Sequence, residues 1–360
     1  MRKQGILVLS AALALYGCST DPATSPLQRQ TGPTAAQGST GASPDSMMAR
    51  ARRAELLRAN RAVIAQADRS ALPFAHTVVR VVVPSAWAVA VRADGLVAVA
   101  NVYGSSITMM DVRTKVTLAT IPATAVPTGI AYSPDGHFLY VAAQGNALDI
   151  IDANAKQRLV SVTGFNAPPL SAITSINGSV VYIGTGGGEI YAMDATTKSF
   201  VKTLPVGGQV NAMAVDSSGT HLYATDMQGG HVIEVNLPAM TVGRTWIVGG
   251  ITQGLAVTPD GKRLVVLNET GLAVNIDLTT GVATLVNGSA PAFGMADAPA
   301  FARMFWTQPG TTNVQGFLVN SSTVIGTLSY GFGDNRRAAF YKPTRTLLVA
   351  DATGSLAFIN

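Results

Sequence analysis

A unit of about 42 residues recurs along most of the chain and restricts the folds open to it. Its clearest copy runs from Ala131 to Asp152 and reads AYSPDGHFLYVAAQGNALDIID. Pro134 presets the first corner of a turn and Gly136 accepts a conformation that other residues resist, which predicts a tight hairpin. Two further apolar runs, separated by Gly145-Asn146, complete three strands. Because three such strands bury no face alone, the unit needs neighbours of its own kind.

The ends of the third strands keep a nearly constant spacing. An aspartate or asparagine closes this strand seven times. These residues are Asp111, Asp152, Asp194, Asn236, Asp277, Asn320 and Asn360. A period of about 40–45 residues with several strands per unit is typical of a β-propeller blade. The sequence therefore predicts an all-β, seven-bladed β-propeller over residues 76–360, in which the recurring aspartates cap turns.

Each blade gains a fourth strand from the run before the next turn, except the last. We expect these outer strands at 116–121, 159–162, 200–204, 244–248, 283–286 and 324–328. The seventh repeat ends with its third strand, whereas the β-rich run 77–83, TVVRVVV, precedes the first repeat. By spacing, this run pairs as the outer strand of the last blade, which closes the ring and covers an open edge.

Two copies of the unit resemble YVTN-type β-propeller repeats. The copies are Ser133-Pro134-Asp135-Gly136 with Leu139-Tyr140-Val141-Ala142, and Thr258-Pro259-Asp260-Gly261 with Leu264-Val265-Val266. The resemblance covers about residues 85–360 and implies the lactonase-like, WD40-like superfamily of seven-bladed propellers. That superfamily includes lactonases and many surface or envelope proteins, so the resemblance predicts a fold and not a function. The sixth repeat departs most, with Ala298-Pro299-Ala300 in place of the Pro-Asp-Gly turn.

Residues 1–45 have the composition of a leader and a linker. Residues 1–17 predict a secretory signal peptide, with Arg2 and Lys3 before a short apolar run. Leu15-Tyr16-Gly17-Cys18 resembles the lipobox of bacterial lipoproteins, which implies lipidation of Cys18, the single cysteine. Residues 18–45, rich in small and polar side chains, predict a flexible tether. Since Ser19 resembles the sorting residue of outer-membrane lipoproteins, we expect a lipid-anchored protein of the bacterial cell envelope, at the outer membrane and facing the periplasm. The alternative is a secreted protein with a stray cysteine.

Residues 46–70 predict an amphipathic helix capped by Ser46. Four of its arginines gather beside the apolar stripe, and they are Arg50, Arg58, Arg61 and Arg69. Residues 71–360 hold sixteen basic and sixteen acidic side chains, so the positive charge is concentrated in this helix. We expect either a solvated helix or contact with anionic lipid or an acidic partner. The neutral body argues against nucleic-acid binding.

Residues that lead into the innermost strands form the mouth of a propeller's central channel. Counting back from the aligned turns places there Trp87, Thr128, Ser171, Asn211, Gln253, Phe293 and Arg337, to within one residue at 171 and 293, backed by Arg336 and Tyr341. This ring has no acid and no histidine. Lactonases of this fold hold a cation with carboxylate and amide oxygens, and related lyases use a histidine base. The ring therefore predicts no catalytic residue, no metal site and no cofactor.

The remaining candidates for chemistry are accounted for by the repeat. His137 and His221 adjoin blade turns, while His76 and His231 fall elsewhere in the repeat frame, so they do not share a metal. The glycine-rich run 184–189 joins two strands with no helix after it, unlike a phosphate-binding loop.

The sequence thus predicts a membrane-anchored, non-catalytic binding or scaffold module whose partners are other envelope proteins. The aromatic and arginine residues at the mouth are of the kind that binding hot spots contain. Ordinary filling of the rim is the simpler explanation for them. The alternative functions are a propeller hydrolase or lyase of the lactonase kind and a structural protein of the cell surface.

Overall fold

The computed structural model describes residues 77–360, apart from 259, 299–302, 319–322 and 332. The predicted signal peptide, tether and arginine-rich helix lie outside the described residues, as do His76, Asn320 and most of the sixth-blade turn. The described residues form 28 β-strands. Among them there is no helix long and apolar enough to cross a membrane.

The strands form seven blades, numbered here in chain order. Blade one is β2 (Ala86–Val91), β3 (Leu96–Asn101), β4 (Ser106–Asp111) and β5 (Thr117–Pro122). Blade two is β6 (Pro127–Tyr132), β7 (Phe138–Ala143), β8 (Ala147–Asp152) and β9 (Gln157–Val162). Blade three is β10 (Pro169–Thr174), β11 (Val180–Thr185), β12 (Glu189–Asp194) and β13 (Phe200–Pro205). Blade four is β14 (Val210–Val215), β15 (His221–Asp226), β16 (His231–Asn236) and β17 (Thr241–Ile247).

Blade five is β18 (Thr252–Val257), β19 (Arg263–Asn268), β20 (Val274–Asp277) and β21 (Ala283–Leu285). Blade six is β22 (Met295–Ala298), β23 (Arg303–Thr307), β24 (Asn313–Leu318) and β25 (Val324–Ser329). Blade seven is β26 (Asn335–Tyr341), β27 (Thr346–Asp351), β28 (Ser355–Ile359) and β1 (Val78–Val82). Every predicted outer strand is present, although β17 begins three residues before the predicted 244.

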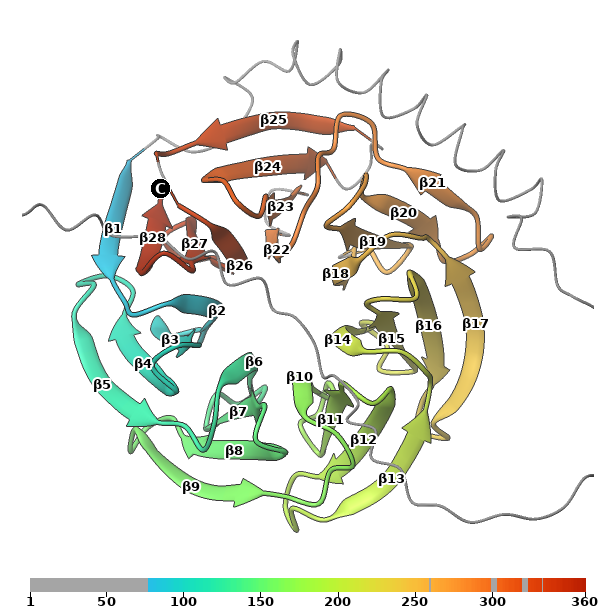
Figure 1. Cartoon of the computed structure of the whole chain (residues 1–360), viewed down its shortest axis with the longest axis horizontal. Helices are drawn as coiled ribbons and strands as arrows, with labels where there is room; N and C mark the ends of the chain where they lie inside the picture. Colours follow the sequence, from blue (N-terminus) through green and yellow to red (C-terminus); the bar gives the residue numbers. More distant parts are fainter. Residues whose placement is uncertain (1–76, 259, 299–302, 319–322, 332) are drawn as a thin grey trace, which may run out of the picture. The chain divides into compact units, whose positions relative to one another are not determined.

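The seven sheets stand around a central axis, with the first strand of each blade innermost (Figure 1). Neighbouring strands within each sheet are antiparallel. The prediction of an all-β, seven-bladed propeller is therefore confirmed.

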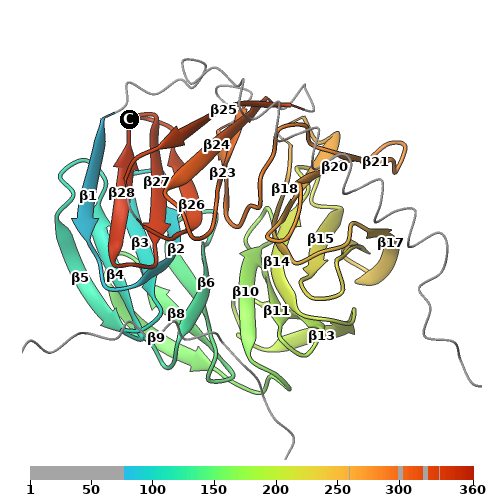
Figure 2. The same ribbon diagram turned by 45° about the horizontal axis from the view of Figure 1, so that its top comes forward.

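The ring closes through β1, which pairs with the chain's last strand β28 in blade seven. The register runs from Val78 opposite Ile359 to Val82 opposite Ser355. The amide of Asn360 also donates to the carbonyl of Thr77 at 3.1 Å. Figure 2 shows β1 beside β28 and β27 at the edge of the molecule. The predicted closure is confirmed, and it removes the open edge that β28 would otherwise present.

The core lies mostly between blades. Val97 and Met110 of blade one share an apolar cluster with Leu348 and Phe358 of blade seven, and all four side chains are fully buried. Leu139 and Val141 of blade two pack in the same way against the other face of blade one. This arrangement is the physical reason that one repeat cannot fold without the next.

The recurring aspartates cap turns, as predicted. Oδ1 of Asp194, for example, accepts hydrogen bonds from the amides of Thr196 and Thr197 at 2.9 and 2.7 Å. Asp111, Asp152 and Asp277 each accept from the same two positions of their own turns. The turns then pass through a residue with positive φ, such as Lys198 at 63°.

Candidate functional site: the mouth of the central channel

The innermost strands carry register shifts near their first residues. Trp87, Thr128, Leu170 and Gln253 each lie in such a shift, unpaired with the second strand of their blade. In β14 and β26 two residues do so, Asn211 with Ala212 and Arg336 with Arg337. A bulge turns a side chain out of the regular pleat. These positions therefore form a ring of side chains at the mouth of the channel.

Structural equivalence corrects two of the predicted ring positions by one residue. The first ring consists of Trp87, Thr128, Leu170, Asn211, Gln253, Phe293 and Arg336. In blade three Leu170 lies eight residues before the turn glycine Gly178, as Thr128 does before Gly136, so Ser171 falls one residue deeper. In blade seven no glycine marks the turn, and the residue with positive φ there is Arg345. Counting back eight residues from Arg345 therefore gives Arg337. The strand register, in contrast, makes Arg336 the first unpaired residue of β26 and the equivalent of Trp87.

A second prediction about the mouth is also corrected. The Tyr341 side chain is buried at the far end of β26, where its hydroxyl accepts a hydrogen bond from Nη2 of Arg113 at 2.8 Å. Tyr341 therefore does not support the rim.

Arg336 lies between two aromatic rings at the mouth. Its guanidinium carbon is 4.8 Å from the ring centre of Trp87 and 5.0 Å from that of Phe293. The two rings meet edge to face with their centres 5.5 Å apart. Nη2 of Arg336 also pairs with Oδ2 of Asp334 at 2.5 Å. We call Trp87, Phe293 and Arg336 the rim cluster. The structure thus brings together three predicted residues from blades one, six and seven, in a geometry that favours cation–π attraction.

A chain of side-chain hydrogen bonds crosses the mouth from blade four to blade five. Nδ2 of Asn211 donates to Oε1 of Gln253 at 2.6 Å, and Nε2 of Gln253 donates to Oε2 of Glu269 at 2.6 Å. Glu269 was missed in the sequence because it follows β19, the second strand, and not the innermost one. The mouth therefore contains a carboxylate just behind the ring, although the ring itself has none.

Thr128 has a structural role in the first ring. Its Oγ1 donates to the carbonyl of Leu170 at 3.1 Å, and the side chain is buried. The hydroxyl thus ties the inner strands of blades two and three together.

One residue deeper, a second ring carries small side chains in six blades. Its members are Ala88, Gly129, Ser171, Ala212, Gly254, Gly294 and Arg337. The glycines stand where neighbouring inner strands approach closely. A Cβ on Gly129 would lie 2.7 Å from the carbonyl oxygen of Leu170, and one on Gly254 would lie 2.8 Å from that of Phe293. The exception is Arg337.

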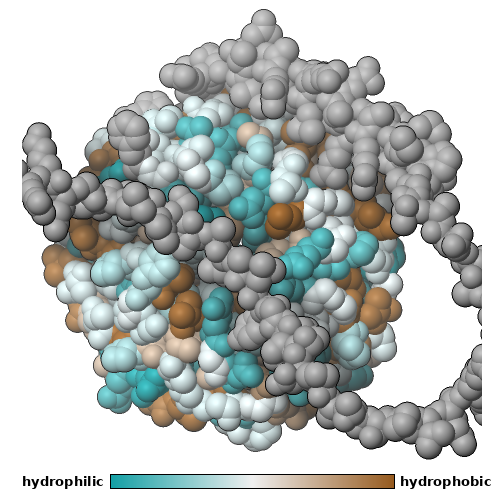
Figure 3. Space-filling view, viewed as in Figure 1, coloured by the Kyte–Doolittle hydropathy of each residue, from teal (hydrophilic) through white to brown (hydrophobic). Residues whose placement is uncertain are grey.

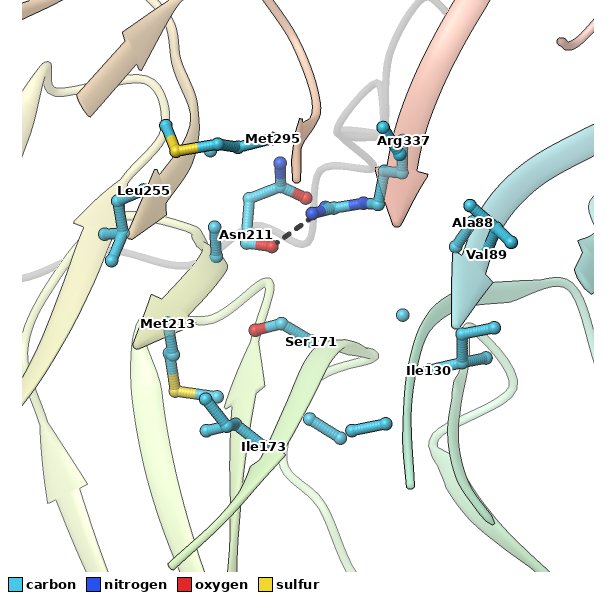
Figure 4. A pocket seen from close by; sticks show the side chains of 16 residues that line it. Ala88, Val89, Ile130, Ser171, Ile173, Asn211, Met213, Leu255, Met295 and Arg337 are labelled. Carbon is cyan, nitrogen blue, oxygen red and sulfur yellow. Dashed lines mark hydrogen bonds between the residues drawn. The ribbon is translucent and has the colours of Figure 1, made fainter. Parts of the chain in front are cut away.

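Arg337 reaches across the space that the small residues leave (Figure 4). Its Nη2 donates to the carbonyl oxygen of Asn211, on the inner strand of blade four, at 3.1 Å. The ring of Phe293 lies 5.9 Å from its guanidinium carbon. Burial lowers the pKa of the Arg337 guanidinium to about 10, which leaves the side chain charged at neutral pH.

A cavity of about 250 Å³ occupies the channel at this level, lined by residues of all seven innermost strands. Its polar side chains come from Arg337, Asn211 and Ser171. Its larger apolar side chains are Val89, Ile130, Ile173, Met213, Leu255 and Met295. Among the described lining residues there is no carboxylate.

The described histidines each lie beside an aspartate of their own blade. His231 Nδ1 is 3.0 Å from Asp226, His221 Nδ1 is 3.3 Å from Asp216, and His137 Nε2 is 3.7 Å from Asp152. Within residues 77–360, leaving aside the gaps, histidine and acidic side chains nowhere gather in threes in a way that could hold a metal ion. The glycine-rich run 184–189 joins β11 to β12, as predicted.

Comparison with known proteins supports the fold. Neither a protein family model nor a curated protein matches the chain. Hydrazine synthase of Kuenenia stuttgartiensis is similar in structure, with a TM-score of 0.71 and 16% identity, covering 78% of this chain and 97% of that one. The β-propeller domain of Cps50 (Swd1) from Myceliophteria thermophila is also similar, with a TM-score of 0.68 and 14% identity, covering 78% of this chain and 99% of that domain. At these identities the likeness establishes the propeller fold alone.

Proposed function

We propose that the protein is a non-catalytic binding module that holds another protein of the bacterial cell envelope at the mouth of its channel. The rim cluster is the observation that carries this proposal. Arginine and large aromatic side chains are enriched in binding hot spots, where they fill well-packed, desolvated pockets. Trp87 and Arg336 keep part of their surface exposed, whereas Phe293 is buried beneath them. The cluster is therefore a supported and accessible anchor.

The proposal includes a place in the cell. Cys18 would carry the lipid, residues 18–45 would act as a tether, and the propeller would face the periplasm from the outer membrane. The support is the lipobox-like run 15–18, the serine at 19 and the YVTN-like repeats in the propeller. The basic segment 46–70 would rest on anionic lipid or on an acidic surface of the partner.

The fold itself does not choose between binding and catalysis. The two similar structures named above are a hydrazine synthase and a Swd1 propeller domain, and one fold supports many functions. The choice between binding and catalysis therefore rests on the side chains at the mouth of the channel.

A capture experiment tests the rim cluster. The lipidated full chain is used to isolate partners from solubilised envelopes, in parallel with Trp87→Ala and Arg336→Gln. We expect both variants to lose at least tenfold of the partner that the wild type retains, since each removes a central anchor. Tyr103→Ala is the matched control, because Tyr103 is an aromatic residue that is 82% exposed outside the cluster. Equal recovery by all four proteins would refute the rim cluster as the docking site.

Glu269 supports a second candidate, a metal-dependent hydrolase of the lactonase kind. Its carboxylate and the amides of Gln253 and Asn211 are hard oxygen ligands of the type that Ca²⁺ and Mg²⁺ prefer. In that case millimolar calcium or magnesium would raise the melting temperature by several degrees in the wild type but not in Glu269→Gln. A flat response to both metals would exclude this candidate and leave the binding module.

A further inference from the structure

Among the described residues, no carboxylate lines the channel beside the charge of Arg337. Its Nε is buried and makes no hydrogen bond among the described residues, although the side chain as a whole keeps some exposure to the cavity. The contacts of its guanidinium are the carbonyl oxygen of Asn211 and the ring of Phe293. A buried charge without a partner is unfavourable unless something compensates it.

The acidic groups nearest in the site are already engaged. Asp334 pairs with Arg336 through Oδ2 and accepts the amide of Gly310 through Oδ1 at 2.7 Å. Glu269 accepts from Gln253 behind the first ring. Neither lines the cavity, so the described protein supplies no anion to Arg337.

Small residues in the other six blades leave room in the channel for this one long side chain. Six blades carry Ala, Gly or Ser in the second ring, and any long residue there would fill the space that Arg337 faces. Figure 4 shows the Arg337 side chain extending from β26 toward Asn211, with Ser171 on a neighbouring inner strand and apolar side chains around the remaining wall. A ligand would thus meet the guanidinium of Arg337, the polar side chains of Asn211 and Ser171, and a group of apolar side chains.

We propose that the central channel binds a small organic carboxylate, with its carboxylate on the part of the Arg337 side chain that faces the cavity and its apolar part against Ile130, Met213 and Leu255. The site is distinct from the rim cluster and does not depend on a protein partner.

Two features favour a monocarboxylate over a phosphate. The guanidinium offers parallel N–H donors whose spacing matches the two oxygens of a carboxylate. A single arginine balances one negative charge, whereas a phosphate dianion would leave a second charge in a cavity whose described lining holds no other cationic side chain. The volume, at about 250 Å³, is below the range of about 300–1,000 Å³ typical of pockets for drug-sized ligands, which points to a short chain.

Calorimetric titration of the full chain tests the site with three probes. They are sodium butyrate, sodium hexanoate and the neutral hexanamide, at constant ionic strength maintained with sodium chloride. We expect both carboxylates to bind, and hexanoate to bind more tightly by roughly fourfold for each added methylene that the cavity accommodates. Hexanamide should bind at least tenfold more weakly than hexanoate. No heat from either carboxylate, or equal affinity for hexanamide, would overturn the proposal.

Variants assign the effect to Arg337. Arg337→Met should weaken hexanoate binding by roughly 100-fold, because it removes two charge-assisted hydrogen bonds. Arg337→Lys should retain a measurable but weaker affinity, since it keeps the charge and loses the fork. Arg336→Gln is the matched control and should bind as the wild type does, because the charge of Arg336 is already paired with Asp334. Unchanged affinity in Arg337→Met would show that the carboxylates bind elsewhere.

The test separates this inference from the proposed function. Arg336→Gln should lose the protein partner and keep the carboxylate, whereas Arg337→Met should do the reverse. Failure of one result leaves the other intact.

Discussion

Gly294 shows how closely the inner strands approach at the second ring. A Cβ at this position would lie 2.4 Å from both the carbonyl oxygen of Arg336 and the Cα of Arg337. Because backbone atoms cannot rotate away as a side chain can, an added methyl group must displace β26. The glycine therefore fixes the position from which Arg337 extends into the cavity.

We expect Gly294→Ala to destabilise the propeller by roughly 1–3 kcal/mol, the usual range for overpacking. It should also weaken carboxylate binding by moving Arg337. Gly186→Ala is the control, since a Cβ there would make ordinary contacts at 3.7 Å and should change stability by no more than about 0.5 kcal/mol. Urea unfolding measures both variants, and equal midpoints would contradict the close approach.

The aspartate caps give the protein a predictable sensitivity to acid. The backbone amide of Thr197 is the main cause that lowers the pKa of Asp194, and the Thr197 hydroxyl adds to it. A carboxyl group whose pKa is lower in the folded state stabilises that state above its unfolded pKa, near 4. The contribution is lost as the pH falls through the folded pKa.

We therefore expect Asp194→Asn to reduce stability at pH 7, and the difference from the wild type to shrink as the pH falls below the unfolded pKa, near 4. Asparagine keeps the acceptor oxygen but not the charge, so the remaining cap is independent of pH in this range. Urea midpoints at pH 7, 5 and 3 measure the difference. A difference between the two proteins that stays constant across this range would contradict the assignment.

At the scale of the element, the periodic features could be predicted from the sequence and the aperiodic ones could not. The strands, the aspartate caps and the pairing of β1 follow from a spacing that repeats in each blade. The reach of Arg337 to Asn211 and the approach of Glu269 to Gln253 depend on how blades pack around the axis. No spacing along the chain indicates these contacts. The second ring of small residues can be recognised only from the pairing register of the inner strands, which depends on the position of each bulge.

The closing strand lends itself to a direct test. A chain that begins at residue 85 lacks β1 and leaves the backbone groups of β28 and the side chains of Phe358 and Ile359 partly uncovered. We expect it to lose the cooperative thermal transition and to aggregate, because an unpaired edge strand recruits others. A chain that begins at residue 71 keeps β1 and is the control. Calorimetry of the two should differ sharply, and a full transition in the shorter chain would refute closure by β1.

At the scale of the whole molecule, one face of the propeller has a mixed surface. Polar and apolar side chains are interspersed over the face shown in colour in Figure 3. Because Cys18 lies outside the propeller, the proposed lipid attachment can be tested separately from folding.

We expect Cys18→Ser to release the protein from the membrane fraction, since it removes the only thiol that a lipid could use. The melting temperature of the released propeller should equal that of the wild type. Fractionation after expression in a diderm bacterium measures the first outcome. Retention of the variant in membranes would refute the lipid anchor.

The basic segment is tested separately with an unlipidated chain. Flotation with vesicles that contain anionic lipid should fall when Arg50, Arg58 and Arg61 are changed to glutamate, because each arginine near such a surface contributes about 1 kcal/mol. Vesicles of neutral lipid are the control. Equal flotation of both chains would end the membrane role of this segment.

The pairing of β1 with β28 also sets the order of events during synthesis. β1 is the first strand of the propeller to be synthesised. Its partner, β28, spans residues 355–359 at the other end of the propeller. Until those residues emerge, β1 has no strand to pair with. Six blades can assemble progressively, but the ring closes only when residues 355–359 are available to pair with β1. Completion of the propeller therefore depends on the arrival of a single five-residue strand, β28, beside a strand made about 270 residues earlier, which is the kind of long-range pairing that slows folding.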